Sequence, residues 1–361
     1  MSKIVLDSYI YDKAKKENTN LSTYLEKRYP TPDGCKLDAF ERAMREEGII
    51  TKSDLTKGIH ADEVNAFYRT EESRILFPEF VARTVREAIA EDTMLPHLVG
   101  VTTYIDTDTY RTFHVDDQPT KAKKVRVTEA ADLPVSKIRG REQVVKLYKF
   151  GRAIDMSYEA LRRMKIDMIT RHIKRIAIQT AKDKVNEILT VIKNGDGNNN
   201  AAATFDLEDF LASPASGATI SFNAEVLLRF LMEFDPFPCD TLIASKEAFT
   251  KLVLAEIPGL NTAQLLRLLA TGVTSGITFN APQMPSGVVR LLWHEGVLGD
   301  NEIAAINAKN AIEQVTEVGS DIQEADRFIK NQTRVLTISE NTGYAKIFNE
   351  ATKILDITPK A

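Results

Sequence analysis

Few residues in this chain stand at spacings that would support catalysis or metal binding. His294 and Glu295, in "WHEGVL", begin like a zinc-binding helix, but no second histidine follows four residues later. The segment "GVTSG" at 272–276 lacks the spacing of a serine nucleophile elbow. No Gly-rich phosphate-binding motif occurs. The sequence therefore predicts no catalytic residue, no metal site and no cofactor, and we expect a protein that is not an enzyme.

The cysteines and the N-terminal segment bear on the compartment. Cys35 and Cys239 are far apart and lack metal-ligand spacing, which is typical of reduced thiols in a cytosolic protein. The first twenty residues contain no apolar signal-peptide region, and no window approaches the roughly 18–20 apolar residues of a membrane helix. We therefore expect assembly in the cytoplasm and no membrane partner.

Two segments carry local positive charge, although the formal net charge is −4. Residues 114–141 hold seven Lys/Arg and four Asp/Glu, and residues 162–184 hold eight and two. We interpret the first segment as an intersubunit contact formed by Asp116, Asp117, Lys121, Lys123, Lys124 and Arg126. For the second, two interpretations remain open: a solvated helix face, or a surface that meets DNA or an acidic partner through Arg171, Lys174, Arg175 and Lys182.

The first basic segment lies between two stretches that alternate like β-strands. "VGVTTYIDTDTYRTF" leads into it and "KIRGREQVVKLYKFGRAI" leads out. Between them, "YRTFHVDDQPTKAKKVRVTEAADLPVSK" is polar and rich in turn residues. A lone subunit would leave the edges of such a ribbon unpaired, so the pattern predicts contact between subunits.

Helical periodicity predicts the main helices. Short ones are expected within 37–50 and 60–73, and an amphipathic helix near 74–92 with Pro78 in its first turn. The most regular helix runs over 166–194, with Gly195 after its end. Its 29 residues span roughly 43 Å at ~1.5 Å per residue, so we expect neighbours along its whole length. Ser157 is the expected N-cap of this helical region.

The C-terminal half alternates between compact and extended patterns. Residues 195–203 predict a flexible loop, and 222–298 an α/β unit with two helices and two strands, the first of them buried. Short strands follow from 302 to 357, with 320–331 as a loop or a helical turn.

This order of elements resembles the major capsid proteins of tailed bacteriophages, whose fold is shared with encapsulins and the herpesvirus capsid floor. The resemblance covers about residues 75–357 and is carried by "RILFPEFVARTVREAI", the ribbon, "AIDMSYEALRRMKIDMITRHI" with the long helix, the α/β unit and the closing strands. It implies an α+β fold. The implied divisions are an N-terminal helical arm (1–72), a helix joining arm to core (73–97), an extended loop (98–151), a peripheral domain (152–214 and 300–361, with spine helix 166–194) and an axial domain (215–299).

The resemblance also implies a function. Hexamers and pentamers of the chain would form an icosahedral virion shell around the double-stranded DNA of a tailed phage or prophage. The implied partners are further copies of the chain, portal, scaffold or decoration proteins, and DNA bound without sequence preference. Two alternatives remain: the shell of an encapsulin compartment, and an α/β enzyme that uses the ribbon to oligomerise. Neighbouring genes would distinguish a phage capsid protein from an encapsulin.

The chain departs from some members of this family in two respects. Those members cross-link a loop lysine to an asparagine of a neighbour; here the tip lysines and Asn307, Asn310, Asn341 and Asn349 are present, but no shielded glutamate is identifiable and we do not expect cross-links. The arm is also short, interrupted by prolines and poor in heptads. We therefore expect it to be retained and to pack against neighbours.

Overall fold

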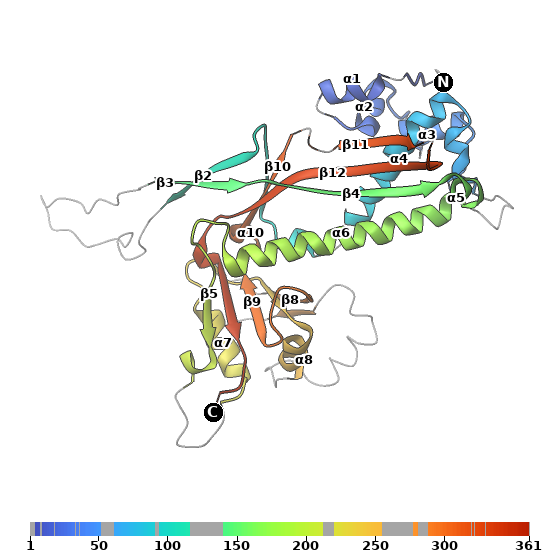
Figure 1. Ribbon diagram of the computed structural model, residues 1–361. Helices are drawn as coiled ribbons and strands as arrows, with labels where there is room; N and C mark the ends of the chain where they lie inside the picture. The colour runs from blue at the N-terminus through green and yellow to red at the C-terminus, as the bar shows by residue number, and fades with distance from the viewer. Residues whose placement is uncertain are drawn as a thin grey trace, which may run out of the picture. The chain divides into compact units, whose positions relative to one another are not determined.

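The computed structural model in Figure 1 describes the chain apart from residues 1–3, 8, 18, 33, 36, 52–60, 91–93, 116–139, 212–219, 255–276, 281–287, 319, 321, 329 and 361. The fold divides into two compact units. Unit 1 contains Met1–Asp92, Tyr148–Asp183 and Thr316–Thr342, and unit 2 contains Thr93–Leu147, Lys184–Val315 and Gly343–Ala361. Helix α6 (Ile166–Asn194) and strand β12 (Thr333–Lys346) continue from one unit into the other.

Unit 1 is rich in helices with side-chain N-caps. It contains α1 (Ile10–Lys16), α2 (Leu21–Arg28), α3 (Ala39–Glu46), the 3-10 helix η2 (Val64–Tyr68), α4 (Glu71–Ala90) and α5 (Tyr158–Arg163). Asn20, Asp38 and Ser157 cap α2, α3 and α5, each accepting a hydrogen bond from the backbone N–H three residues on. Ser157 thus caps the short α5, and α6 begins separately at Ile166.

Pro78 does not lie in the first turn of its helix, contrary to the prediction. α4 begins at Glu71, which places Pro78 in the helix interior. The earlier start has a local cause: the Thr70 N–H donates to Ser73 Oγ (3.0 Å), and the Ser73 N–H donates to Thr70 Oγ1 (2.9 Å). This reciprocal cap stabilises the first turn, and Pro78 then removes one interior backbone hydrogen bond.

The sheet of unit 1 is built around β12. Strand β4 (Tyr148–Ser157) pairs antiparallel with one edge of β12 and lies beside it in Figure 1. Strand β11 (Ile322–Phe328) also pairs antiparallel with β12, so that Val335 stands opposite both Asp155 and Asp326. Residues 322–328 therefore form a strand, whereas the sequence predicted a loop or helical turn. The pairing with β12, which a local pattern does not reveal, determines this conformation.

Helix α6 has the predicted bounds and one apolar face. Gly195 follows its last residue with φ of +85°, the left-handed conformation of a helix-ending glycine. Within unit 1, Ile169, Ile173, Ala177 and Ala181 form its buried face.

Unit 2 contains the base of the ribbon. Strands β2 (Thr109–Val115) and β3 (Gly140–Lys146) pair antiparallel, with Thr109 opposite Lys146. Strand β1 (Val101–Ile105) instead neighbours β10 (Ile312–Glu317). The ribbon proper thus lies within 109–146, a shorter span than the 98–151 of the predicted extended loop.

The main sheet of unit 2 has six strands, in the order β5-β13-β9-β6-β8-β7. They are β5 (Ala203–Asp206), β13 (Thr352–Asp356), β9 (Glu302–Ile306), β6 (Thr241–Ala244), β8 (Val288–Trp293) and β7 (Ile277–Asn280). The helices of the unit are η3 (Leu95–His97), η4 (Leu207–Asp209), α7 (Ala224–Met232), α8 (Lys246–Leu254), α10 (Ala308–Ala311) and η5 (Asn349–Ala351). Strands β9 and β13 thus complete the predicted α/β unit, whereas the sequence analysis assigned them to the peripheral domain.

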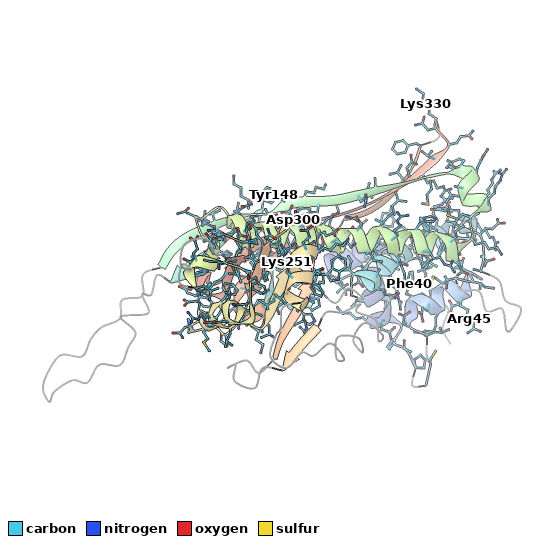
Figure 2. The ribbon with its side chains drawn as sticks, turned by 90° about the horizontal axis from the view of Figure 1, so that it is seen from below. Phe40, Arg45, Tyr148, Lys251, Asp300 and Lys330 are labelled. Carbon is cyan, nitrogen blue, oxygen red and sulfur yellow. The ribbon has the colours of Figure 1, made fainter. Side chains whose placement is uncertain are left out.

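Each unit has its own hydrophobic core. In unit 1, residues of α2, α3, η2 and α4 join the buried face of α6 in one cluster. Phe40 shows how α3 contributes: it is fully buried, while Arg45 on the same helix is exposed (Figure 2). Two clusters in unit 2 lie on the two faces of the six-stranded sheet. The chain therefore has the α+β architecture that the sequence predicted.

Candidate assembly surfaces

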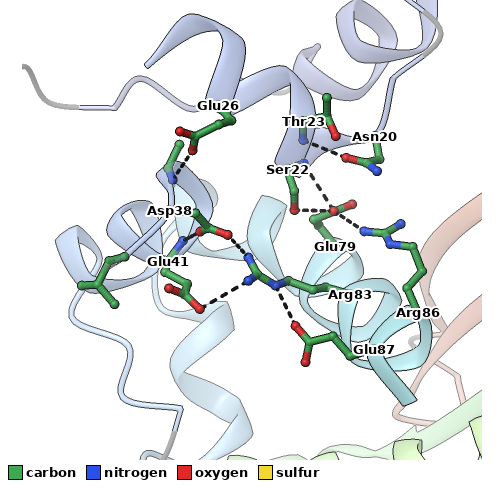
Figure 3. Close-up of polar contacts among 12 residues, drawn as sticks. Asn20, Ser22, Thr23, Glu26, Asp38, Glu41, Glu79, Arg83, Arg86 and Glu87 are labelled. Atoms are coloured by element: carbon green, nitrogen blue, oxygen red, sulfur yellow. Dashed lines mark hydrogen bonds and ion pairs between the residues drawn. The ribbon is translucent and has the colours of Figure 1, made fainter. Parts of the chain in front are cut away.

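Arg83 of α4 holds the N-terminal helices in place (Figure 3). Its guanidinium pairs with Asp38 at the start of α3, with Glu41 (Nη2–Oε1 3.4 Å) and with Glu87 one turn along α4 (Nε–Oε1 3.0 Å). Burial acts to lower the pKa of Arg83, but hydrogen bonds to Glu87 and Asp38 outweigh it and raise the pKa. One cation thus links the N-terminus of α3 to α4.

A buried carboxylate makes a second link to the same helix. Glu79 of α4 is 1% exposed, and its Oε1 accepts from Ser22 Oγ (2.6 Å) and pairs with Arg86 Nη2 (2.6 Å). The Tyr11 hydroxyl donates to the Ile75 carbonyl (2.8 Å) and accepts from the Glu79 N–H (3.2 Å). Burial, and then the charge of Glu79, raises the pKa of Tyr11. Figure 3 shows Ser22, Glu79 and Arg86 converging between α2 and α4.

These links accompany an apolar contact with the rest of unit 1. Leu25, Phe40 and Phe77 share one cluster with Ile166 and Ile173 of α6. The first fifty residues therefore pack on their own chain through both polar and apolar contacts. Their packing against neighbouring subunits stays a prediction.

The four cations predicted on the long helix do not all lie in the same environment. Arg171, Arg175 and Lys182 are exposed, on the side of α6 away from its buried isoleucines. Lys174 is half-buried and interacts within the chain. The structure thus brings three of the four onto one exposed face.

The predicted tip residues, Asp116, Asp117, Lys121, Lys123, Lys124 and Arg126, lie outside the described residues. The base of their ribbon is described. Tyr110 of β2 donates its hydroxyl to Glu313 Oε1 (3.0 Å), and Thr103 of β1 hydrogen-bonds the same carboxylate. Glu313, which no sequence motif marked, therefore joins the ribbon to β10.

A buried lysine fixes the turn after α6. Lys346 of β12 is 4% exposed and donates its Nζ to the Asn200 carbonyl (2.7 Å), while its N–H donates to Asp196 Oδ2 (3.1 Å). Burial lowers the pKa of Lys346 to about 8, although Asp196 and Glu350 oppose the shift. This anchor lies in the "GDGNNN" turn that the sequence predicted only as a loop.

Three of the four asparagines considered for cross-linking have side-chain partners within the chain. Asn307 Nδ2 donates to the Pro238 carbonyl (2.6 Å), Asn310 Nδ2 donates to Asn307 Oδ1 (2.9 Å), and Asn341 Nδ2 donates to Glu317. The absence of cross-links stays a prediction.

The described residues contain no group of His, Cys, Asp or Glu that could hold a metal ion. No helix among them is long and apolar enough to cross a bilayer.

One surface depression, of about 410 Å³, is lined partly by Glu26, Cys35 and Asp38. Both carboxylates are occupied by backbone: Glu26 accepts from the Thr31 (2.6 Å) and Ala39 (2.8 Å) N–H groups, and Asp38 caps α3. The carboxylates that line the depression therefore stabilise the local backbone.

Comparison with known families decides the identity. Residues 141–345, more than half of the chain, match a family model described as phage capsid protein. The chain belongs to the phage capsid protein family. Its matched region runs from β3 through α6 into β12 and includes five strands of the six-stranded sheet, all but β13. The protein is therefore a structural component of the virion capsid.

Several solved structures align with much of this chain at low sequence identity. The virus-like particle of Pyrococcus furiosus shares 13% identity over 77% of this chain and 98% of its own, with a TM-score of 0.47. A phage-related protein from Bordetella bronchiseptica shares 12% identity over 77% and 96%, with a TM-score of 0.48. A structure from Mycobacterium phage Che8 shares 12% identity over 69% of this chain and 85% of its own, with a TM-score of 0.43. No curated protein matches in sequence. We base the family assignment on the family model alone.

Proposed function

We propose that this capsid protein is the major shell subunit of a tailed phage or prophage. Hexamers and pentamers of it assemble in the host cytoplasm into an icosahedral shell around double-stranded DNA. Many weak contacts suffice, because closure makes each further contact intramolecular. Portal, scaffold or decoration proteins complete the particle, and DNA is held without sequence preference. The observation that supports this proposal best is the anchored ribbon.

The ribbon has a fixed base and a charged tip. Glu313 binds Tyr110 and Thr103, so β1, β2 and β10 meet at one carboxylate. Beyond this base, residues 116–137 have the composition of a polar tip that carries Lys121, Lys123 and Lys124. A fixed base reduces the entropy lost when the tip binds. We therefore assign the ribbon to contact with a neighbouring subunit through charge complementarity.

Charge reversal at the tip tests this assignment. The triple variant Lys121→Glu/Lys123→Glu/Lys124→Glu should remain folded and soluble but form at least about tenfold fewer shells by negative-stain electron microscopy, since three attractive contacts per subunit become repulsive. The matched triple Lys→Arg variant keeps the charge and should assemble normally. Normal shells from the glutamate variant would overturn the role of the tip.

The contents of the particle separate a phage shell from an encapsulin. Particles from the native host should contain nuclease-protected double-stranded DNA. Protein cargo in place of DNA would identify an encapsulin-type compartment. A small defined oligomer and no closed particle would instead favour the enzyme with a ribbon dimerisation arm.

A further inference from the structure

One exposed line of α6 has the spacing of a coiled-coil seam. Met168, Arg171, Arg175, Ile178 and Lys182 follow one another at intervals of three, four, three and four residues. All five are exposed, Met168 by 57% and Ile178 by 49%. Intervals of this kind place side chains in one narrow stripe, the a and d positions of a heptad repeat. From Met168 to Lys182, a distance of fourteen residue steps, this stripe, the α6 seam, is roughly 21 Å long at ~1.5 Å per residue.

The described part of the chain supplies no ion pair to the charges of the α6 seam. Among the described residues, no carboxylate forms an ion pair with Arg171, Arg175 or Lys182. The opposite face of the helix is already packed, with Ile169, Ile173 and Ala177 buried. The seam can therefore take a partner without any rearrangement of the core.

We propose that the α6 seam binds an amphipathic helix of a partner protein, with apolar side chains opposite Met168 and Ile178 and carboxylates opposite the three cations. The apolar contacts supply burial, and the ion pairs select the partner and set the register. Such a helix would fold as it docks, since an isolated segment of two or three heptads is only marginally helical in water.

A second copy of α6 fits this seam poorly. In a parallel, in-register pair, each cation would face itself. In the antiparallel register that joins Met168 to Ile178, Arg171 would face Arg175. In the register that joins Met168 to Lys182, Arg175 would face its own copy. Because like charges at these positions destabilise helix pairs, the complementary partner is an acidic helix.

Duplex DNA also fits less well. Phosphates are bound by cations and polar donors, and Met168 and Ile178 would add nothing to such a contact. Ile178 separates Arg171 and Arg175 from Lys182, and Met168 lies at the N-terminal end of the stripe. Mixed apolar and basic side chains at heptad spacing favour a protein helix.

Binding of a designed peptide tests the proposal on the unassembled full-length protein. The probe is a fluorescent peptide of about 21 residues, or three heptads, with leucine and glutamate at its a and d positions and alanine and glutamine elsewhere. Its control is a scrambled peptide of the same composition. Anisotropy should show saturable binding at least about tenfold tighter than for the scrambled control. Equal binding of the two peptides would overturn the proposal.

Paired variants distinguish a helix from DNA. Arg171→Glu/Arg175→Glu and Met168→Gln/Ile178→Gln should each weaken peptide binding about tenfold or more. Only the first should weaken binding of a duplex of about 20 base pairs, since DNA contacts depend on charge. If Met168→Gln/Ile178→Gln leaves peptide binding unchanged, the face is electrostatic and fits DNA instead.

A matched charge reversal controls for net charge. Arg162→Glu/Arg163→Glu changes the charge equally on exposed residues of α5, outside the seam. Peptide binding to this variant should stay within about twofold of the unmodified protein. An equal loss in both charge variants would reduce the seam to nonspecific attraction and overturn the proposal. Since every measurement uses unassembled protein, none depends on the proposed shell.

Discussion

The two sheets of this capsid protein are covered to very different extents. In unit 2, Leu242 of β6 points into one hydrophobic cluster and Ile243 into the other, and both are buried. In unit 1, the alternate residues of β4 from Lys149 to Ser157 are all exposed on one face. The sheet of unit 2 is thus buried on both faces by its own chain, whereas β4 presents one open face.

This difference separates a self-sufficient fold from one that leaves surface to neighbours. Every residue of β6 is buried, as expected of a central strand covered on both sides. β4 pairs with β12 along one edge, and its exposed face carries Gly151 and Ala153, which offer little side-chain bulk. Natural proteins cover the accessible face of such a strand or use it for association. We infer that β4 contributes to contacts in the shell.

The largest expected effect on the free energy of unfolding comes from truncating a buried isoleucine, and the same truncation can be made in both sheets. Ile243→Ala in β6 removes a fully buried side chain and should lower the free energy of unfolding by about 2–5 kcal/mol. Ile154→Ala in β4 removes a half-buried one and should cost about 1 kcal/mol. Urea denaturation of the unassembled protein, followed by circular dichroism, measures both. Equal losses at the two sites would contradict the contrast between the sheets.

The pH dependence of stability tests how completely unit 2 buries a charged side chain, that of Lys346. Burial lowers the pKa of Lys346 to about 8, from an ordinary value of 10.5. Between these values the unfolded chain binds more protons than the folded one, so stability should rise as the pH increases from about 8 to 10.5. The slope from this one group is at most about 1.4 kcal/mol per pH unit.

Lys346→Met isolates that contribution. The variant cannot titrate, so the difference in unfolding free energy between it and the unmodified protein should change steadily between pH 8 and 10. Denaturant titrations at several pH values measure this difference, in which the shared titration of other lysines and tyrosines cancels. A difference that stays constant over the interval would show that the ammonium is well solvated and that the anchor to Asn200 is not buried in solution.

How far the sequence predicts this structure depends on the range of the interactions. Helix α6 ends where Gly195 indicated, because its apolar period and its stop signal are local. The pairing of β11 with β12 and the place of β9 in the six-stranded sheet depend on strands far away in the sequence, and the local pattern missed both. Pro78 was misplaced because the reciprocal cap of Thr70 and Ser73 was overlooked.

The candidate surfaces follow the same rule. Arg83 and Asp38 are 45 residues apart, and Tyr110 and Glu313 are 203 apart, so no motif could join them. The seam on α6 is different, because Met168 and Ile178 stand at heptad spacing with the cations and this spacing is visible in the sequence. The assignments of the tip lysines and of the seam cations remain predictions.

The smallest effect on stability, and the most specific for assembly, is expected at the exposed end of β4. Tyr148 is 63% exposed, so Tyr148→Ala should change the free energy of unfolding by less than about 0.5 kcal/mol. If β4 meets a neighbouring subunit, loss of the ring should still reduce the yield of closed shells several-fold, because aromatic side chains dominate many interfaces. Tyr9→Ala, at an equally exposed tyrosine before α1, is the matched control. Shell yields by sedimentation should fall for Tyr148→Ala alone; equal yields from both variants would show that this end of β4 stays in solvent after assembly.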